Sequence, residues 1–339
     1  MDVTETSAQN APATTTPKPL WKRVLQFPLV AMILAFLFVT LAQALGGLVS
    51  WLAGNGLDDE VYATPADLVF GLAVTVLTVL AYKLVVVRMG EQPRDDLPFD
   101  SRAGDAISGF AQGALVFSAI VGVAALVGAY QALGLSPAED WLPLLIGAGL
   151  MAGVTEEILL RGIVFRWLEE FGGSWFALAL SALIFGFLHA GNPNATLISS
   201  LSIALAAGVL LGGAYMLTRN LWLAIGMHAG WNVTQGLVWD VPISGLPLDG
   251  WVESRLVGDP IVSGGAFGLE ASVITMVVAT AYGVWLVVRA ARRGNVVRNW
   301  WARRRLASDE AVRVDVDADA HQLRTTFPRR TARTTSHTP

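Results

Sequence analysis

The chain has 339 residues, of which 54% are hydrophobic and only 15% are charged. Soluble domains carry roughly 25% charged residues, and the charges here are concentrated in the first 26 and last 50 positions. The middle is too apolar for an ordinary soluble domain, and the composition excludes disorder of the whole chain. The absence of cysteine excludes disulfides, thiol nucleophiles and cysteine-ligated metal sites.

Eight apolar stretches are long enough, or nearly so, to cross a bilayer, which takes about 20 helical residues. In chain order they cover residues 27–52, 66–87, 106–133, 142–165, 174–190, 196–217, 221–239 and 270–289. The first is much longer than the apolar core of a signal peptide, which is about 7–15 residues, so we expect it to remain in the mature protein. The sequence therefore predicts an all-α, polytopic integral membrane protein with about eight transmembrane helices.

The basic residues between these stretches indicate the orientation of the chain, because they accumulate on the cytoplasmic side. One side carries Lys18, Lys22, Arg23, Arg88, Arg94, Arg102, Arg166, Arg219 and the arginines from Arg289 onward. The opposite side carries a single arginine, Arg255. An even number of spans places both termini on the basic side. We predict a multi-pass protein of the cell membrane with both termini in the cytoplasm.

The two ends of the chain differ in composition from the apolar part. We expect residues 1–26 to form a disordered cytoplasmic tail and residues 27–289 to form the membrane domain. Residues 290–339 are predicted to be an arginine-rich, largely disordered cytoplasmic tail that attracts anionic lipid. The connection at 241–269, rich in glycine and proline, is either a structured cap or an external loop.

Few ionisable residues lie within the apolar stretches, where a charge is costly and is therefore a candidate for function. The fourth stretch contains Glu156, Glu157 and Arg161, the fifth contains His189 and the seventh His228. Glu157 and Arg161 are four residues apart on one helical face, so we expect them to form an ion pair. Glu156 is rotated from them by about 100° and must find a partner elsewhere.

A second pair with helical spacing, His228 and Asn232, projects from one face of the seventh stretch. Each feature alone could be structural, since such residues also join membrane helices. Together with Glu156 and His189 they suffice for peptide hydrolysis, which needs a base for water and donors for the oxyanion. In this interpretation Glu156, helped by His189, activates the water. His228 and Asn232 donate to the oxyanion.

A metal-assisted interpretation gives the same residues other roles. Glu156, His189 and His228 supply one carboxylate and two imidazoles, a ligand set typical of catalytic zinc with one open position. A divalent metal such as zinc and a metal-free site therefore both remain open. The helical rise places His189 about 22 Å from the cytoplasmic end of its stretch, deeper than the other candidates at about 10–16 Å. Tilt or a break near residues 191–193 would be needed to bring them together.

Three short motifs follow one another on successive apolar stretches: EExxxR at Glu156, Glu157 and Arg161, FxxxH at Phe185 and His189, and HxxxN at His228 and Asn232. In this order, over residues 156–232, they resemble the CAAX-protease and bacteriocin-processing (CPBP, Abi) family, which includes the Ras-converting prenyl-protein endopeptidase. The resemblance implies an α-helical intramembrane endopeptidase. It assigns water activation to the first glutamate and the FxxxH histidine, oxyanion stabilisation to HxxxN, and support to the second glutamate and the arginine. Members are described as metalloproteases, and a glutamate-dependent mechanism is also argued.

Other functions remain as alternatives. A non-catalytic scaffold or bacteriocin-immunity protein could use the same ion network, and a proton-coupled transporter also places Glu, His and Arg inside a helical bundle. The sequence shows no convincing internal repeat of the transporter kind. It also lacks the HExxH, paired YD and GxGD, and GxSG motifs of other intramembrane proteases. We predict an intramembrane endopeptidase whose partners are the lipid bilayer and a peptide or membrane-protein substrate, with no nucleic acid.

Overall fold

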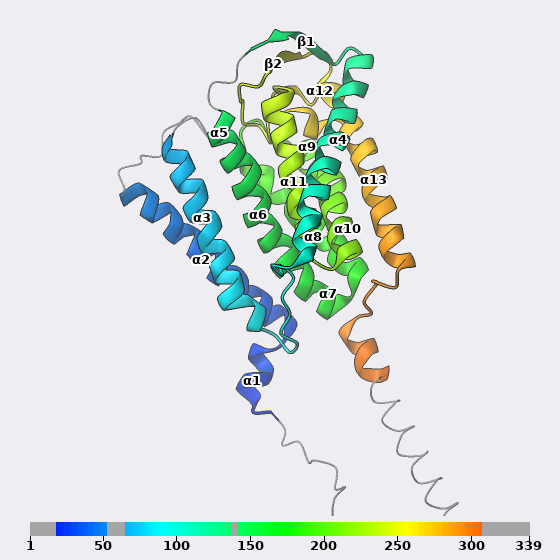
Figure 1. Ribbon diagram of the computed structural model, residues 1–339. Coiled ribbons are helices and arrows are strands. Elements are labelled where there is room, and N and C mark those ends of the chain that lie inside the picture. Colours follow the sequence, from blue (N-terminus) through cyan, green and yellow to red (C-terminus); the bar gives the residue numbers. More distant parts are fainter. Residues whose placement is uncertain (1–17, 53–64, 137–140, 307–339) are drawn as a thin grey trace, which may run out of the picture.

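The computed structural model describes residues 18–52, 65–136 and 141–306, and helices dominate it (Figure 1). The α-helices are α1 (Leu20–Leu25), α2 (Pro28–Leu52), α3 (Pro65–Leu84), α4 (Asp105–Leu126), α5 (Trp141–Leu144), α6 (Ala152–Glu157), α7 (Arg166–Gly172), α8 (Ser174–Leu188), α9 (Leu197–Ile203), α10 (Val209–Thr218), α11 (Trp222–Val233), α12 (Pro260–Ser263) and α13 (Val273–Arg292). Wider π-helical turns, Leu145–Met151, Ile158–Phe165 and Ala204–Gly208, join α5 to α6, α6 to α7 and α9 to α10. Such turns inside helices often occur at functional sites.

Seven helices in the described part of the chain are long and apolar enough to cross a membrane. They are Pro28–Val49, Leu68–Arg88, Ser101–Leu126, Trp141–Gly172, Ser174–Gly191, Leu197–Thr218 and Val273–Arg292. They match seven of the eight predicted stretches, so the all-α polytopic fold is confirmed. The remaining stretch, 221–239, is also helical, as α11 followed by the π-helical turn Thr234–Val238, but it is shorter. Most of α11 is buried by its neighbours, so it needs little of the apolar surface that faces lipid.

Close contact between α4 and α11 depends on glycine. A methyl group added at Gly226 would lie 2.0 Å from the carbonyl oxygen of Ala106, and one at Gly230 would lie 2.1 Å from that of Phe110. Gly109 and Gly113 on α4 are equally crowded by the backbone of α11. Two GxxxG patterns therefore face each other, a device that lets membrane helices approach closely. This packing fixes the position of the helix that carries His228 and Asn232.

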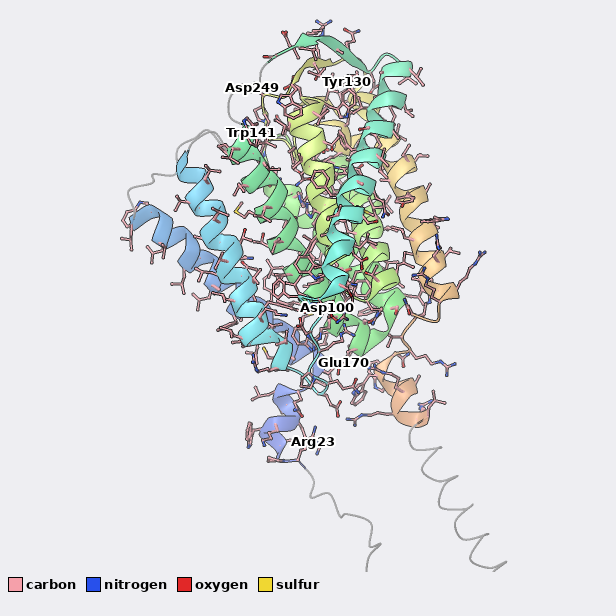
Figure 2. The ribbon with its side chains drawn as sticks, in the orientation of Figure 1. Arg23, Asp100, Tyr130, Trp141, Glu170 and Asp249 are labelled. Atoms are coloured by element: carbon pink, nitrogen blue, oxygen red, sulfur yellow. The ribbon has the colours of Figure 1, made fainter. Side chains whose placement is uncertain are left out.

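The end of the bundle opposite the basic residues, here called the cap end, carries a two-stranded antiparallel sheet. Strand β1 (Tyr130–Leu135) pairs with β2 (Val252–Leu256). The predicted third span, 106–133, is therefore too long: the helix ends at Leu126, and the chain turns at Gly128, whose φ is +80°. Figure 2 shows Tyr130 and Asp249 at the cap end and Glu170 near the opposite end.

The connection at 241–269 is a structured cap, which settles a point that the sequence left open. The Asp240 carboxylate accepts hydrogen bonds of 2.9 Å from the backbone N–H groups of Gly250 and Ser254. The Tyr130 hydroxyl donates to the Trp239 carbonyl at 3.1 Å. These bonds tie the connection to the sheet and to the end of the α11 segment.

The two ends of the described chain meet at the basic end of the bundle. The rings of Phe27 and Trp300 lie 6.4 Å apart, and the Arg303 guanidinium donates to the Glu170 carbonyl at 2.6 Å. Both ends of the described chain therefore lie at the same end of the bundle. Helix α1 and a helical turn at 300–306 lie within the segments predicted to be disordered tails. The outer parts of both tails, 1–17 and 307–339, lie outside the described residues.

Candidate active site

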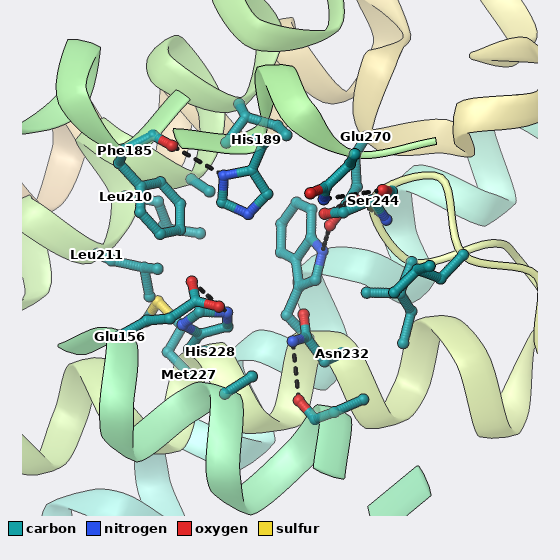
Figure 3. Close-up of a pocket in the computed structure, with 18 residues that line it drawn as sticks. Glu156, Phe185, His189, Leu210, Leu211, Met227, His228, Asn232, Ser244 and Glu270 are labelled. Carbon is teal, nitrogen blue, oxygen red and sulfur yellow. Dashed lines mark hydrogen bonds and ion pairs between the residues drawn. The ribbon is translucent and has the colours of Figure 1, made fainter. Parts of the chain in front are cut away.

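A cavity of about 240 Å³ lies inside the bundle, and Glu156, His189, His228 and Asn232 all line it (Figure 3). The four residues come from α6, from the turn after α8, and from α11. Side chains of α9, α10 and the connection at 241–269 complete the wall. The structure therefore brings together the four residues that the sequence singled out from separate stretches.

Within the EExxxR motif the two glutamates point to different surroundings. The Arg161 Nη1 atom lies 2.9 Å from the Glu157 Oε1 atom, and both side chains are fully buried. The Arg161 guanidinium also donates to the Gly208 carbonyl at 3.3 Å and lies 4.7 Å from the centre of the Phe185 ring. The predicted ion pair is confirmed. The Glu156 side chain, 34% exposed, faces the cavity instead.

The imidazole of His228 lies between the two glutamates. Its Nδ1 atom lies 2.9 Å from the Glu157 Oε1 atom, and its Nε2 atom lies 4.0 Å from the Glu156 Oε2 atom. An ionised carboxylate can only accept, so Nδ1 carries the proton in this hydrogen bond. Glu157 therefore holds the HxxxN histidine as well as the arginine. The sequence did not indicate this link, because 71 positions separate Glu157 from His228.

The position of His189 depends on a break in the fifth span. Helix α8 ends at Leu188, and the short 3-10 turn His189–Gly191 follows it. The His189 Nδ1 atom lies 2.8 Å from the Phe185 carbonyl oxygen, so Nδ1 donates and Nε2 is left for the cavity (Figure 3). The depth difference expected for this histidine does not prevent it from reaching the same cavity as the other three.

Asn232 lies one helical turn beyond His228 and is only 5% exposed. Its Nδ2 atom donates to the Ala148 carbonyl at 2.9 Å, on the first π-helical turn. An amide group has two N–H hydrogens, so one is left after this bond. The contact with Ala148 fixes the side chain across two helices.

The proposed metal ligands can be tested on this geometry. Carboxylate and imidazole donors suit zinc, and both histidines use Nδ1 elsewhere, which leaves Nε2 for a ligand. Within the described residues, however, no three His, Asp or Glu side chains lie close enough together to hold one ion. The donor types of Glu156, His189 and His228 fit a metal, but their arrangement here does not.

The cavity also has polar wall residues that the sequence did not single out, namely Glu270, Ser244 and Trp231. Glu270 stood at the edge of the last predicted span, and α13 begins only at Val273. A carboxylate at the border of an apolar stretch was the available signal. The role of Glu270 depends on its contacts with a loop, and the spacing of residues within a helix or strand does not predict such contacts.

Comparison with known proteins supports the assignment made from the motifs. Residues 138–234 match the family described as type II CAAX prenyl endopeptidase Rce1-like. This range contains the EExxxR, FxxxH and HxxxN motifs. Comparisons with curated proteins and with solved structures gave no significant match.

The fold and the matched segment together define a class, that of multi-pass intramembrane proteases. Within this class, residues 138–234 are similar to the CAAX-type endopeptidases, and the rest of the chain lies outside the match.

Proposed function

We propose that this protein is an endopeptidase that hydrolyses a peptide bond of a membrane-associated protein or peptide. The observation that carries the proposal is the convergence of Glu156, His189, His228 and Asn232 on one cavity within the bundle. A carboxylate, two imidazoles and a carboxamide supply a base and hydrogen-bond donors, the two requirements of amide hydrolysis.

In the proposed reaction Glu156 is the general base. Its carboxylate takes a proton from a water molecule as the water oxygen attacks the carbonyl carbon of the substrate. The His189 Nε2 atom accepts the second hydrogen of the water and orients it. The tetrahedral intermediate then collapses, the C–N bond breaks, and Glu156 returns its proton to the leaving amine. The products are a carboxylic acid, which releases the remaining proton of the water to solvent to become a carboxylate, and an amine.

The oxyanion that forms at the substrate carbonyl needs donors at fixed positions. Asn232 offers its remaining amide N–H, held in place by the bond to Ala148. His228 donates from Nε2 when it is an imidazolium, a form that Glu157 at 2.9 Å and Glu156 at 4.0 Å stabilise. Glu157 thereby acts through His228, and Arg161 compensates the remaining charge of Glu157.

Purified protein in detergent or nanodiscs tests the proposal against a library of membrane-associated peptides, with and without a prenyl group. We expect cleavage by the wild type, and its loss in Glu156→Ala and His228→Ala while both variants still elute as folded protein. Glu253→Ala, an exposed carboxylate on β2, serves as the matched control. Equal cleavage by wild type and Glu156→Ala would contradict the assignment. Proton flux in liposomes that the same variants abolish would favour a transporter.

The role of a metal needs a separate measurement. Cleavage is measured after treatment with a chelator, and bound metal is quantified in the wild type and in His189→Ala. Activity that survives the chelator, in protein without stoichiometric metal, supports the metal-free scheme. Activity that is lost and then restored by zinc would replace it with the metal-assisted one.

We further propose that the basic end of the bundle faces the cytoplasm. Arg94, Arg166, Arg219 and Arg303 lie in the network of contacts at that end, whereas Arg255 lies on β2 at the cap end. The chain has no cysteine, so single cysteines can be introduced and labelled in intact cells. We expect an impermeant maleimide to label Glu253→Cys and not Arg298→Cys. The reverse pattern would invert the topology.

A further inference from the structure

The carboxylate of Glu270 lies at the cavity wall and has no role in the proposed hydrolysis. The residue is 8% exposed. Its Oε2 atom accepts two hydrogen bonds from Ser244, at 2.7 Å from the backbone N–H and 2.8 Å from the hydroxyl. Its Oε1 atom lies 3.2 Å from the indole Nε1 atom of Trp231 on α11. One carboxylate thus joins the loop wall of the cavity to a helix wall (Figure 3).

The loop wall is a tight turn over residues 243–246, here called the Ser244 turn. Ile243 and Leu246 close it through two backbone hydrogen bonds of 3.0 and 2.9 Å. Ser244 has a φ of +49°, a left-handed conformation that is unfavourable for a residue with a side chain. Such a conformation persists only where surrounding contacts impose it, and the two bonds to Glu270 are such contacts.

The Ser244 turn also reaches the other side of the site. The Ser244 carbonyl accepts a hydrogen bond of 3.1 Å from the Asn192 side chain, three positions after His189. At the opposite end of the network, Trp231 directly precedes Asn232 in α11. Glu270 therefore accepts from the Ser244 turn, which in turn accepts from Asn192, and it shares the Trp231 indole N–H with the Gln235 Oε1 atom at 2.8 Å.

From these contacts we infer that Glu270 is a positioning residue that holds the Ser244 turn as the wall against which the substrate lies. This inference rests on the proposed function. Ile243, Ser244 and Leu246 line the same cavity as Glu156, so a displaced turn changes the space available to the substrate. The turn does not carry the base or the oxyanion donors. Glu270 therefore determines substrate binding more than the chemical step.

Kinetics of Glu270→Gln test the inference with the peptide that the wild type cleaves. A glutamine has one acceptor oxygen and one donor nitrogen, so it cannot accept on both sides. We expect KM to rise about 10-fold while kcat stays within about threefold, the signature of lost binding. Glu253→Gln, the same change on exposed β2, should alter neither constant. A fall in kcat with unchanged KM would overturn the inference.

A double-mutant cycle tests whether Glu270 acts through the turn. Ser244→Ala removes the hydroxyl bond and is the milder change, so it also serves if Glu270→Gln does not fold. We expect Ser244→Ala to raise KM about two- to fivefold, and the double variant to match Glu270→Gln, because coupled residues are not additive. Additive effects would contradict the inference.

Hydrogen exchange gives a readout that does not depend on cleavage. The backbone N–H of Ser244 donates to Glu270, so residues 241–250 should exchange faster in Glu270→Gln than in the wild type or in Glu253→Gln. Unchanged exchange in this segment would overturn the inference. If no peptide is cleaved by the wild type, the proposed function fails, and the exchange measurement still decides whether Glu270 holds the turn.

Discussion

Two walls of the same cavity are built in different ways. The helical wall consists of α6, the π-helical turn Ile158–Phe165 that follows it, and α11, where Glu157, Arg161 and His228 form a connected ionic network buried from solvent. The loop wall consists of the Ser244 turn, where Ser244 and Gly245 adopt positive φ, and the Glu270 carboxylate adds two bonds to the backbone bonds that close the turn. The helical wall has continuous helical backbone, α-helical and π-helical in turn, and crowded glycine contacts behind it.

The difference indicates that, in the proposed reaction, the helical wall serves the chemical step and the loop wall serves substrate binding. Chemistry needs atoms held within a fraction of an ångström, and helices packed through glycine provide that precision. Loops tolerate changes of sequence more readily than packed helices do, so the loop wall suits the selection of a substrate in the proposed reaction. We therefore expect variants in the helical wall to affect kcat and stability, and variants at the loop wall to affect KM.

Glu156→Gln should have the largest effect on activity. The change keeps the size of the side chain and removes the base, so we expect kcat to fall about 10²- to 10⁴-fold. Because the Glu156 carboxylate faces the cavity and is 34% exposed, the thermal unfolding temperature should stay near that of the wild type. Peptide cleavage and a thermal melt of the purified protein measure the two quantities. A large loss of stability in Glu156→Gln would show that the residue is structural.

Arg161→Met should have the largest effect on stability. Arg161 compensates Glu157 where both side chains are fully buried, and breaking a buried pair costs about 3–5 kcal/mol. We expect the free energy of unfolding, measured by chemical denaturation in mild detergent, to be clearly lower than that of the wild type. The double variant Glu157→Met with Arg161→Met should recover part of the stability, since no buried charge is left unpaired. It should not recover cleavage, because His228 loses the carboxylate that orients it.

Asn232→Ala should reduce kcat by about 10²- to 10³-fold, the cost of removing one oxyanion donor. The matched control is Gln112→Ala, because Gln112 accepts a hydrogen bond of 2.7 Å from Tyr282 between α4 and α13. Both variants lose one interhelical bond, which is worth about 0.6–2 kcal/mol in membranes. Only Asn232→Ala should lose activity. Equal losses in the two variants would mean that Asn232 acts through packing.

Much of the fold and of the helical wall could be predicted from the sequence, for identifiable reasons. Apolar length predicts membrane spans because the bilayer requires it, and seven of the eight stretches have this length and composition in the structure. Spacing of four residues predicted the Glu157–Arg161 pair, because the interaction lies within one helix. The convergence of the three motifs followed from family resemblance and from the cost of isolated charges in lipid.

The features that the sequence did not predict depend on contacts between distant positions. The bond between Glu157 and His228 joins two helices, and the bond between Glu270 and Ser244 joins two loops. The end of α4 was misplaced because residues up to 133 are apolar and nevertheless enter strand β1. The opposed glycines of α4 and α11 are recognisable only once the two helices are known to be neighbours.

The smallest effect is expected at the cap end, in Asp240→Asn. Burial raises the pKa of the Asp240 carboxyl above its usual value, although backbone N–H groups of Gly250 and Ser254 lower it in part. A raised pKa means that the folded state binds more protons than the unfolded state across the interval between the two values. Stability therefore falls as pH rises through that interval.

Thermal melts of wild type and Asp240→Asn across mildly acidic pH test this sign. The asparagine does not titrate, so the variant should show a flatter dependence, with cleavage kinetics close to those of the wild type. A wild-type stability that instead rises with pH over this range, with the slope reduced in Asp240→Asn, would mean that the backbone donors outweigh burial at this carboxylate. An ionised carboxylate would then stabilise the cap, as the buried ion pair stabilises the helical wall. The difference between the helical wall and the loops at the cap end would be smaller than we infer.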